Sequence, residues 1–407
     1  MQKYFKLSLL VIIVILYGFD ALSQTGEPIV IGHKFKIDSQ ILAEEKQIFI
    51  SLPHKYAEGV HSYPVVFVLE AEILFEPTNT ISKMMAQRSK MPQSIIVGLA
   101  NGTYKKRHEL SHKRWKGKPE EYIKFFKEEL IPYLENKYRA NSHRTIIGLS
   151  STNGFIYEAL LNEPNLFNSY IALSAHLEWP RNIGVKLIDE IIAKTSEANY
   201  PKINLYLGRA DGDAKEDSEV QKAYDDAKEK LQKSKSKSLT YKIEIIANEE
   251  HYLMSLAGIR SGFETIYPNS LWKNPGWRGW DKNKNYAQSY YKPYFDKLSS
   301  IYGFDIYPVE DGHAYGYYLA GKANSAIKWG TNKQERELLE LGISYYPNSA
   351  NMHMMLAQAY IKANQPKKAL DTAEKAILHA KKYHSNELGS YQEKLQKIEK
   401  LISESTK

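Results

Sequence analysis

The chain has 407 residues, which is enough for two domains or for one large domain with an appendage. Its 43% hydrophobic and 25% charged residues are ordinary for a soluble globular protein. The net charge is +8, but the basic residues are dispersed and accompany no nucleic-acid-binding motif, so we expect no nucleic-acid partner. The absence of cysteine excludes disulfides, thiolate metal sites and cysteine nucleophiles.

The first residues have the pattern of a secretory signal peptide. Lys3 and Lys6 precede the apolar run 7–19, and small residues follow at Ala21 and Ser23. The run is short for a membrane span, so we predict a signal peptide over 1–23 and no stable span, with an uncleaved anchor as the alternative. The mature protein is then expected to be periplasmic or secreted.

Eight segments between residues 28 and 248 have the composition of β-strands. The first two, 28–37 and 45–53, alternate like half-exposed antiparallel strands. The others are almost continuously apolar, as strands buried on both faces are, and lie at 63–71, 93–101, 144–150, 169–175, 202–210 and 241–248. Helical patterns fall between them at 119–138, 154–162, 184–194 and 216–233. This alternation predicts an α/β fold with a mostly parallel sheet flanked by helices.

The pattern changes after Pro268. Three tryptophans stand among glycine and proline breakers at positions 272, 277 and 280, and helical patterns follow near 287–301 and 313–329. We interpret 269–332 as a Trp-rich helical connector. Its tryptophans either seal the domain junction, which we favour, or form the floor of a binding cleft.

The segment 333–407 has no strand pattern and is expected to be helical. Within it, 347–378 resembles a tetratricopeptide repeat, with small and large residues at the positions Leu356, Ala357, Tyr360, Ala369 and Ala373. A single repeat cannot bury its apolar face alone, so we expect it to dock on the preceding helices. It is either a structural appendage or a module that binds a protein partner.

A candidate nucleophile lies between an apolar strand that ends at Gly148 and a helix that begins near Gly154. This strand–turn–helix arrangement is the setting of a nucleophile elbow, which presents a serine Oγ at the carboxyl edge of the sheet. The usual pattern is G-x-S-x-G, and here it is G-L-S-S-T, with Thr152 in place of the second glycine. We interpret Ser150 as the nucleophile, and a serine-rich helix cap is the alternative.

A serine nucleophile needs a base, and the base needs an orienting acid. In the α/β-hydrolase fold the chain order is serine, acid, histidine. Asp211 follows the strand at 202–210 and His251 follows the strand at 241–248, so both are expected in loops at the carboxyl edge. We predict His251 as the base and Asp211 as the acid, with Asp213 and Asp217 as alternatives for the acid.

The oxyanion of an acyl-transfer reaction needs two backbone N–H donors. One is expected at Ser151, directly after the nucleophile. The other is expected in the turn after the strand at 63–71, at Ala71 or its neighbour Glu72.

Residues 108–112 read HELSH, which matches the zinc-binding pattern H-E-x-x-H. On one helix, His108 and His112 would bind zinc, with Glu109 as the general base. Seven Lys or Arg between positions 105 and 118 disfavour a dication, and no third ligand is identifiable, with Glu128 and Glu129 as the nearest downstream candidates. We therefore predict no metal and no cofactor. We name His108 and Glu109 as candidates for the mouth of the serine site; a plain surface loop is the interpretation we favour, and a zinc peptidase is a remote alternative.

Three stretches, 39–56, 63–75 and 162–179, resemble the Putative esterase family of α/β-hydrolases, which includes siderophore esterases, feruloyl esterases and S-formylglutathione hydrolases. The helical tail is similar to that of members with a C-terminal repeat. The resemblance implies an esterase domain over 24–268. It also implies a carboxylic ester hydrolase that forms an acyl-serine intermediate and acts on a small-molecule or glycan-linked ester.

The chain departs from the family pattern near the elbow. Leu149 stands where histidine is usual, Thr152 replaces a glycine, and Glu70 replaces an aspartate. The stretch 106–111 resembles the family's R-x-R-D-L-T loop, with His108 at an arginine position. A catalytically degenerate hydrolase fold, which binds a partner through its repeat, is therefore the alternative function.

Overall fold

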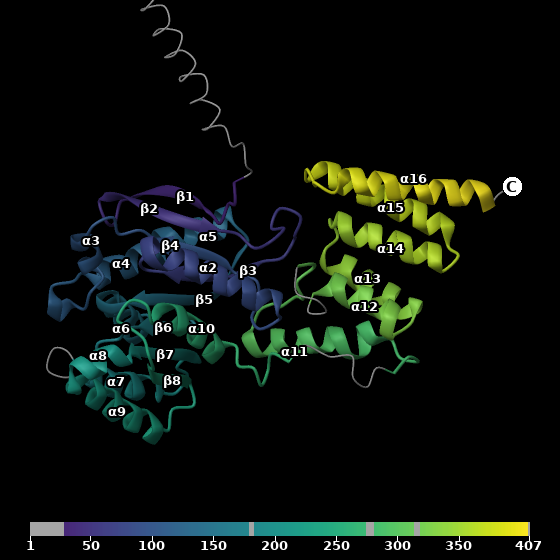
Figure 1. Cartoon of the computed structure of the whole chain (residues 1–407). Helices are drawn as coiled ribbons and strands as arrows, with labels where there is room; N and C mark the ends of the chain where they lie inside the picture. Colours follow the sequence, from purple (N-terminus) through teal and green to yellow (C-terminus); the bar gives the residue numbers. More distant parts are fainter. Residues whose placement is uncertain (1–27, 179–182, 274–280, 313–317, 406–407) are drawn as a thin grey trace, which may run out of the picture.

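The structure is a computed structural model and describes residues 28–178, 183–273, 281–312 and 318–405 (Figure 1). The expected signal peptide lies outside the described residues, as do Trp277 and Trp280 of the connector. Those expectations stay predictions.

All eight expected strands are present and form one sheet in the order β1-β2-β4-β3-β5-β6-β7-β8. The strands are β1 His33–Ser39, β2 Glu44–Ser51, β3 Tyr63–Val68, β4 Ile95–Leu99, β5 Ala140–Leu149, β6 Ser169–Leu173, β7 Ile203–Ala210 and β8 Leu239–Ile246. Strand β2 pairs antiparallel with β1 and β4, and all other neighbours pair in parallel. The expected mostly parallel sheet is confirmed.

Helices connect the strands. They are α2 Ala71–Gln87, α3 Tyr104–Glu109, α4 Pro119–Phe125, α5 Ile131–Lys137, α6 Asn153–Asn162, α7 Ile183–Thr195, α8 Asp211–Glu216, α9 Ser218–Lys233 and α10 Ser255–Ile266. Short 3₁₀ turns, η1 Lys113–Trp115 and η3 Ser150–Thr152, and a π turn, η2 Phe126–Leu130, complete this part. The expected helical segments are found, whereas α2, α3, α8 and α10 lie outside the segments that the sequence predicts as helical.

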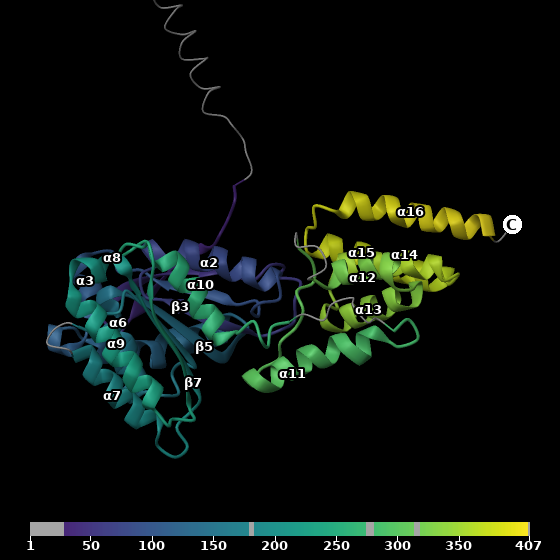
Figure 2. The same ribbon diagram turned by 60° about the horizontal axis from the view of Figure 1, so that its bottom comes forward.

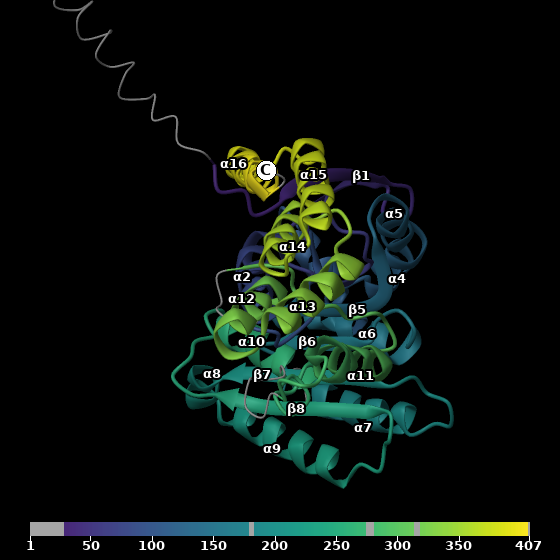
Figure 3. The same cartoon turned by 90° about the vertical axis from the view of Figure 1, so that its right-hand side faces the viewer.

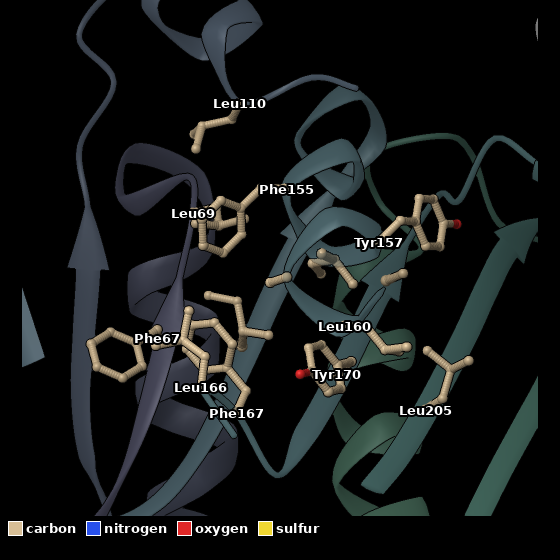
Figure 4. Packing of buried hydrophobic residues seen from close by; sticks show 14 of the residues in the cluster. Phe67, Leu69, Leu110, Phe155, Tyr157, Leu160, Leu166, Phe167, Tyr170 and Leu205 are labelled. Atoms are coloured by element: carbon tan, nitrogen blue, oxygen red, sulfur yellow. The ribbon is translucent and has the colours of Figure 1, made fainter. Parts of the chain in front are cut away.

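Each central strand divides its side chains between two cores, because successive residues of a strand point to opposite faces. In β3, Val65 and Phe67 join the core that α6, α7 and α9 cover, while Val66 and Val68 join the core that α2 and α10 cover. Figure 2 shows these helices on the two sides of the sheet, and Figure 4 shows Phe67 packed near Phe167 in the first core.

Parallel pairing brings several strand ends to one edge of the sheet. Val68 of β3 pairs with Ile147 of β5, and Leu149 at the end of β5 pairs with Leu173 at the end of β6. Strands β7 and β8 end together, because Ala210 pairs with Ile246. The loops that follow β3, β5, β6, β7 and β8 therefore meet at the carboxyl edge, where α/β folds bind ligands.

The C-terminal part is helical, as expected, and lies beside one end of the sheet (Figure 1); the same helices face the viewer in Figure 3. Its elements are η4 Ala287–Tyr291, α11 Lys292–Tyr302, α12 Leu319–Trp329, α13 Asn332–Tyr345, α14 Ala350–Lys362, α15 Pro366–Lys382 and α16 Leu388–Ser405. Ala357 of α14 packs with Ala369 and Ala373 of α15, and Met352 and Leu356 share a core with α12 and α13. The expected docking is confirmed, while the identity of the helices as a tetratricopeptide repeat stays a prediction.

Trp272 lies at the junction between the two parts. It is 1% exposed, and its Nε1 donates to the Tyr302 hydroxyl at 3.0 Å. That hydroxyl donates to the carbonyl of Ile266 at the end of α10. Trp272 therefore seals the place where α10 meets α11, as we favoured, and does not line an open cleft.

Candidate active site

Ser150 stands at the turn between β5 and α6. Its φ is +56°, a left-handed conformation that non-glycine residues adopt rarely and at an energetic cost. The strained turn is stabilised on both sides, because β5 is a central strand and α6 begins three residues later. This is the backbone geometry of a nucleophile elbow.

Thr152 fits the turn and strengthens it. Its side chain is fully buried, and its Oγ1 accepts from the Leu149 N–H at 2.8 Å. The hydroxyl also lies 3.3 Å from Oε1 of Glu70. The close approach that demands glycine occurs instead at Gly154, where a Cβ would lie 1.9 Å from the backbone nitrogen of His112. The missing glycine at 152 therefore leaves the elbow intact.

Glu70 and Arg107 tie the elbow to the first turn of α2. Arg107 Nε donates to Glu70 Oε2 at 2.7 Å, and Arg107 Nη2 donates to the Leu149 carbonyl at 3.4 Å. Glu70 is 2% exposed; burial raises the pKa of its carboxyl, and the hydrogen bond from Arg107 opposes that shift. The side chains thus connect the loops after β3, β4 and β5.

His251 lies in the turn between β8 and α10, with its Nε2 3.1 Å from Ser150 Oγ. The Ser174 hydroxyl donates to the His251 carbonyl and fixes this turn to the end of β6. Burial lowers the pKa of His251 below the ordinary 6.5; Asp213 opposes the shift, and Arg209 adds to it. The imidazole is therefore neutral at pH 7 and can accept the serine proton.

The acid partner of His251 is Asp213, which corrects our expectation of Asp211. The Asp213 oxygens lie 3.2 and 3.1 Å from His251 Nδ1. Asp211 is the first residue of α8, and its carboxylate binds Lys215 at 2.7 Å and accepts from a backbone N–H of the loop after β8 at 3.0 Å. The third candidate, Asp217, caps α9. Of the three candidate acids, only Asp213 has its carboxylate within hydrogen-bond distance of the His251 ring.

Sequence reasoning missed a second histidine at the same serine. His176 Nε2 lies 3.3 Å from Ser150 Oγ, and its Nδ1 lies 3.0 Å from Glu178 Oε1. The buried Arg209 approaches both, at 3.0 Å from His176 Nδ1 and 3.2 Å from Glu178 Oε1. Burial would raise the pKa of Glu178, but His176 and Arg209 bring it below its ordinary value. The signal was available, since His176 follows β6 as His251 follows β8.

The two expected oxyanion donors are compatible with this arrangement. Ala71 is the first residue of α2, and the first N–H groups of a helix have no carbonyl partner within it. Val68 of β3 pairs with Ile147 of β5. Ala71 comes three residues after Val68, and Ser150 comes three residues after Ile147, so both lie just beyond the same edge of the sheet. Ser151 follows the nucleophile within η3.

The HELSH segment does not form a zinc-binding helix. Helix α3 ends at Glu109, and His112 lies outside it as the N-cap of η1, where its Nδ1 accepts the Arg114 N–H at 3.2 Å. Within the described parts of the chain, no three or more His, Asp or Glu side chains are grouped to hold a metal ion. The spacing of two histidines on one helical face, on which the zinc alternative depended, is absent.

His108 and Glu109 make their contacts away from the serine, which agrees with the favoured surface loop and not with the candidate place at the mouth of the site. His108 Nε2 lies 2.7 Å from the Trp115 carbonyl, and Glu109 accepts from the Tyr122 hydroxyl at 3.1 Å. Both side chains therefore stabilise the segment between β4 and α4, to which they themselves belong. The residue of this loop that reaches the elbow is their neighbour Arg107.

Comparisons with known proteins agree with this fold. Residues 39–295 match the family model described as Putative esterase. Ferri-bacillibactin esterase BesA from Bacillus subtilis is 27% identical over 187 residues, which are 39% of this chain. The alignment spans 63% of that relative, slightly less than two thirds of its length.

Two solved structures share the architecture. An IroE-like serine hydrolase from Shewanella oneidensis is 20% identical, with a TM-score of 0.59 over 77% of this chain and 99% of its own. An uncharacterised protein from Capnocytophaga ochracea is 18% identical, with a TM-score of 0.56 over 90% of this chain and 99% of its own. At such identities the likeness establishes the fold. The second match is long enough to include part of the C-terminal helical region.

Proposed function

Because the chain belongs to the Putative esterase family, we propose that it is a serine carboxylic-ester hydrolase that acts through an acyl-serine intermediate. The observation that carries the proposal is the contact of Ser150 Oγ with His251 Nε2 at 3.1 Å, with Asp213 on the other ring nitrogen. Nucleophile, base and orienting acid stand on three strand-end loops in the order that the fold requires.

In the acylation step, His251 takes the proton from Ser150 as Oγ attacks the ester carbonyl carbon. The negative charge that develops on the carbonyl oxygen is stabilised by the N–H groups of Ser151 and Ala71. When the intermediate collapses, the carbon–oxygen bond to the alcohol breaks, and the alcohol leaves with the proton from His251. Asp213 stabilises the imidazolium that exists between these two proton transfers.

In the deacylation step, water takes the place of the alcohol. His251 removes a proton from the water, which attacks the acyl carbon, and Ser150 leaves with that proton. The carboxylic acid is released and the serine is restored. No cofactor enters this sequence of steps.

The proposed substrate is a small-molecule carboxylic ester, and a siderophore ester is the first class to test. The reason is the likeness to a ferri-bacillibactin esterase, which is 27% identical. Feruloyl esters and acetylated glycans are the other classes for a substrate panel. Hydrolysis of one class at a kcat/KM far above the others would assign the substrate.

The test of the reaction is the variant Ser150→Ala on a p-nitrophenyl ester. We expect turnover to fall by about 10³-fold or more, because the nucleophile is lost. Ser151→Ala is the matched control, since it removes a neighbouring hydroxyl and keeps the backbone N–H donor. Full activity in Ser150→Ala would overturn the assignment. Covalent labelling of the wild type by a fluorophosphonate would also exclude the alternative of a degenerate, non-catalytic binding protein.

We further propose that the protein is exported to the periplasm or secreted, on the basis of the charged and apolar pattern in residues 1–23. Within the described residues, no helix has both the length and the apolar composition that crossing a bilayer needs. The proposed division is an esterase domain over 24–268, a connector over 269–332 and a helical region from 333. Binding of a protein partner by that helical region is a separate proposal, which removal of the helices would test in a pull-down.

A further inference from the structure

We propose that His176 is a second catalytic histidine of this site, able to take the proton of Ser150 in place of His251. The inference rests on the proposed serine-hydrolase function. Both imidazoles present Nε2 to the same oxygen, at 3.3 Å for His176 and 3.1 Å for His251. Each also has a carboxylate 3.0–3.2 Å from its Nδ1, which is Glu178 for His176. The serine therefore stands between two histidine–carboxylate pairs.

Both neutral tautomers of His176 find hydrogen-bond partners. With the proton on Nδ1, the ring donates to Glu178 Oε1 at 3.0 Å and offers the lone pair of Nε2 to Ser150. With the proton on Nε2, the ring accepts at Nδ1 from Arg209 Nη1 at 3.0 Å. In the first tautomer, Arg209 Nη1 still donates to the Ser174 carbonyl at 3.1 Å, so it is satisfied in either case. His176 can thus receive or deliver a proton at Nε2 while its Nδ1 keeps a hydrogen-bond partner in either tautomer.

The charges of the site suit one extra proton. Among the described residues, Asp213 and Glu178 contribute two negative charges, and the guanidinium of Arg209 lies 2.9 Å from Asp213 Oδ2 and 3.2 Å from Glu178 Oε1. These three described groups together carry one negative charge, which a single imidazolium on His251 or His176 neutralises. Because the side chains of all three flanking residues are at most 15% exposed, water screens these charges weakly. The ring centroids of His176 and His251 lie 5.4 Å apart, so two imidazolium charges here would repel each other.

The proton transfer through His176 balances as it does for His251. The Oγ–H bond of Ser150 breaks as its oxygen forms the bond to the acyl carbon, and the proton moves to His176 Nε2. Glu178 then faces the imidazolium at Nδ1. The same proton passes from Nε2 to the departing alcohol oxygen, which leaves His176 neutral. No oxidant, reductant or further reactant is needed.

The test compares three variants of the full-length protein on a p-nitrophenyl ester: His251→Gln, His176→Gln and the double variant. We expect His251→Gln to retain turnover at least about tenfold above Ser150→Ala, because a second base contributes part of the usual general-base effect. The double variant should fall to the Ser150→Ala level. His176→Gln alone should lose less than about tenfold, since His251 and Asp213 are intact.

Glu178→Gln in the His251→Gln background should also remove the residual turnover, because it deletes the negative charge that faces Nδ1 and stabilises the imidazolium of His176. The matched control is Glu250→Gln in the same background, since Glu250 is an exposed acid beside residue 251. Thermal melting establishes that each variant is folded. An inactive wild type overturns both proposals. If the wild type is active but His251→Gln is no faster than Ser150→Ala, only the proposal of a second base is overturned. The same proposal is overturned if the residual turnover of His251→Gln persists in the double variant His251→Gln/His176→Gln.

Discussion

The carboxylate of Asp213 lies 3.1 Å from Nδ1 of His251, although the two residues are 38 positions apart in the chain. Strands β7 and β8 are neighbours and end in register, so their following loops meet. Helix α8 starts at the end of β7, and its first turn presents Asp213 toward the imidazole. The pair therefore follows from the sheet register together with the position at which one short helix begins.

Asp213→Asn should lower kcat/KM on the order of 10²-fold, because the asparagine neither favours the Nδ1–H tautomer of His251 nor stabilises its imidazolium. Asp211→Asn is the matched control and should stay within a few-fold of the wild type, since its carboxylate binds Lys215 and a backbone N–H. Steady-state kinetics on one ester compares the two variants. Equal losses would contradict the assignment of Asp213.

The pH profile of kcat/KM should have an acid limb whose midpoint lies below 6.5. Burial lowers the pKa of His251, and only the neutral imidazole accepts the serine proton, so activity rises with pH through that pKa and then levels. Asp213 raises this pKa, while Arg209 and the neighbouring His176 lower it. The limb of Asp213→Asn should therefore move to still lower pH, and a move to higher pH would contradict the assigned charges.

The sequence predicted the eight strands and placed Ser150 and His251 at strand ends, because hydrophobic periodicity and chain order are local properties. It could not choose between Asp211 and Asp213, since that choice depends on where α8 begins. Helix α2 escaped prediction because Pro77 lies inside it and proline normally ends a helix.

The sequence pattern of a catalytic triad contains a single histidine, which His251 supplies, so it does not predict a role for His176. The tertiary contacts that reveal it, those with Arg209 and Glu178, come from β7 and from the loop that follows β6. The HELSH motif failed for a related reason. Its five letters do not say that the helix stops at Glu109, before His112 is reached.

Thr152→Val should destabilise the fold by about 1–3 kcal/mol, because the buried N–H of Leu149 loses its acceptor and Glu70 loses a donor. Valine has nearly the same shape as threonine, so the change isolates the hydroxyl. Thr152→Ser keeps that hydroxyl and should retain most of the stability. Urea unfolding measures both variants, and a Thr152→Val protein as stable as the wild type would refute the proposed role of the side chain in closing the turn.

Arg107→Met should destabilise by about 3 kcal/mol or more at neutral pH, since it leaves the buried carboxylate of Glu70 without its cation. In this variant the pKa of Glu70 should rise further above its unfolded value. The destabilisation is therefore complete at pH values above the pKa of Glu70 in the folded protein. It disappears as the pH falls below the pKa of Glu70 in the unfolded protein. The double variant Arg107→Met/Glu70→Gln should recover part of the loss, because it removes the charge. Unfolding at several pH values measures this, and a pH-independent loss would contradict the electrostatic explanation.

Lys55, in the turn that follows β2, connects the esterase domain to the segment between α11 and α12, and Lys55→Met should weaken that connection. Its Nζ lies 3.1 Å from Glu310 Oε1 and 2.7 Å from Asp311 Oδ2, and Glu310 is 2% exposed. Without the lysine, two adjacent carboxylates repel each other in a poorly hydrated place, so we expect a loss of about 3 kcal/mol.

The matched control is Lys36→Met, which removes an ion pair with Glu45 whose two side chains are more than half exposed, and should cost less than about 1 kcal/mol. Limited proteolysis adds a local measurement. If Lys55 connects the two parts, cleavage between the esterase domain and the helices should be faster in Lys55→Met than in Lys36→Met. Equal cleavage rates and equal unfolding free energies in the two variants would mean that hydrophobic packing around Trp272 holds the junction without this ion pair.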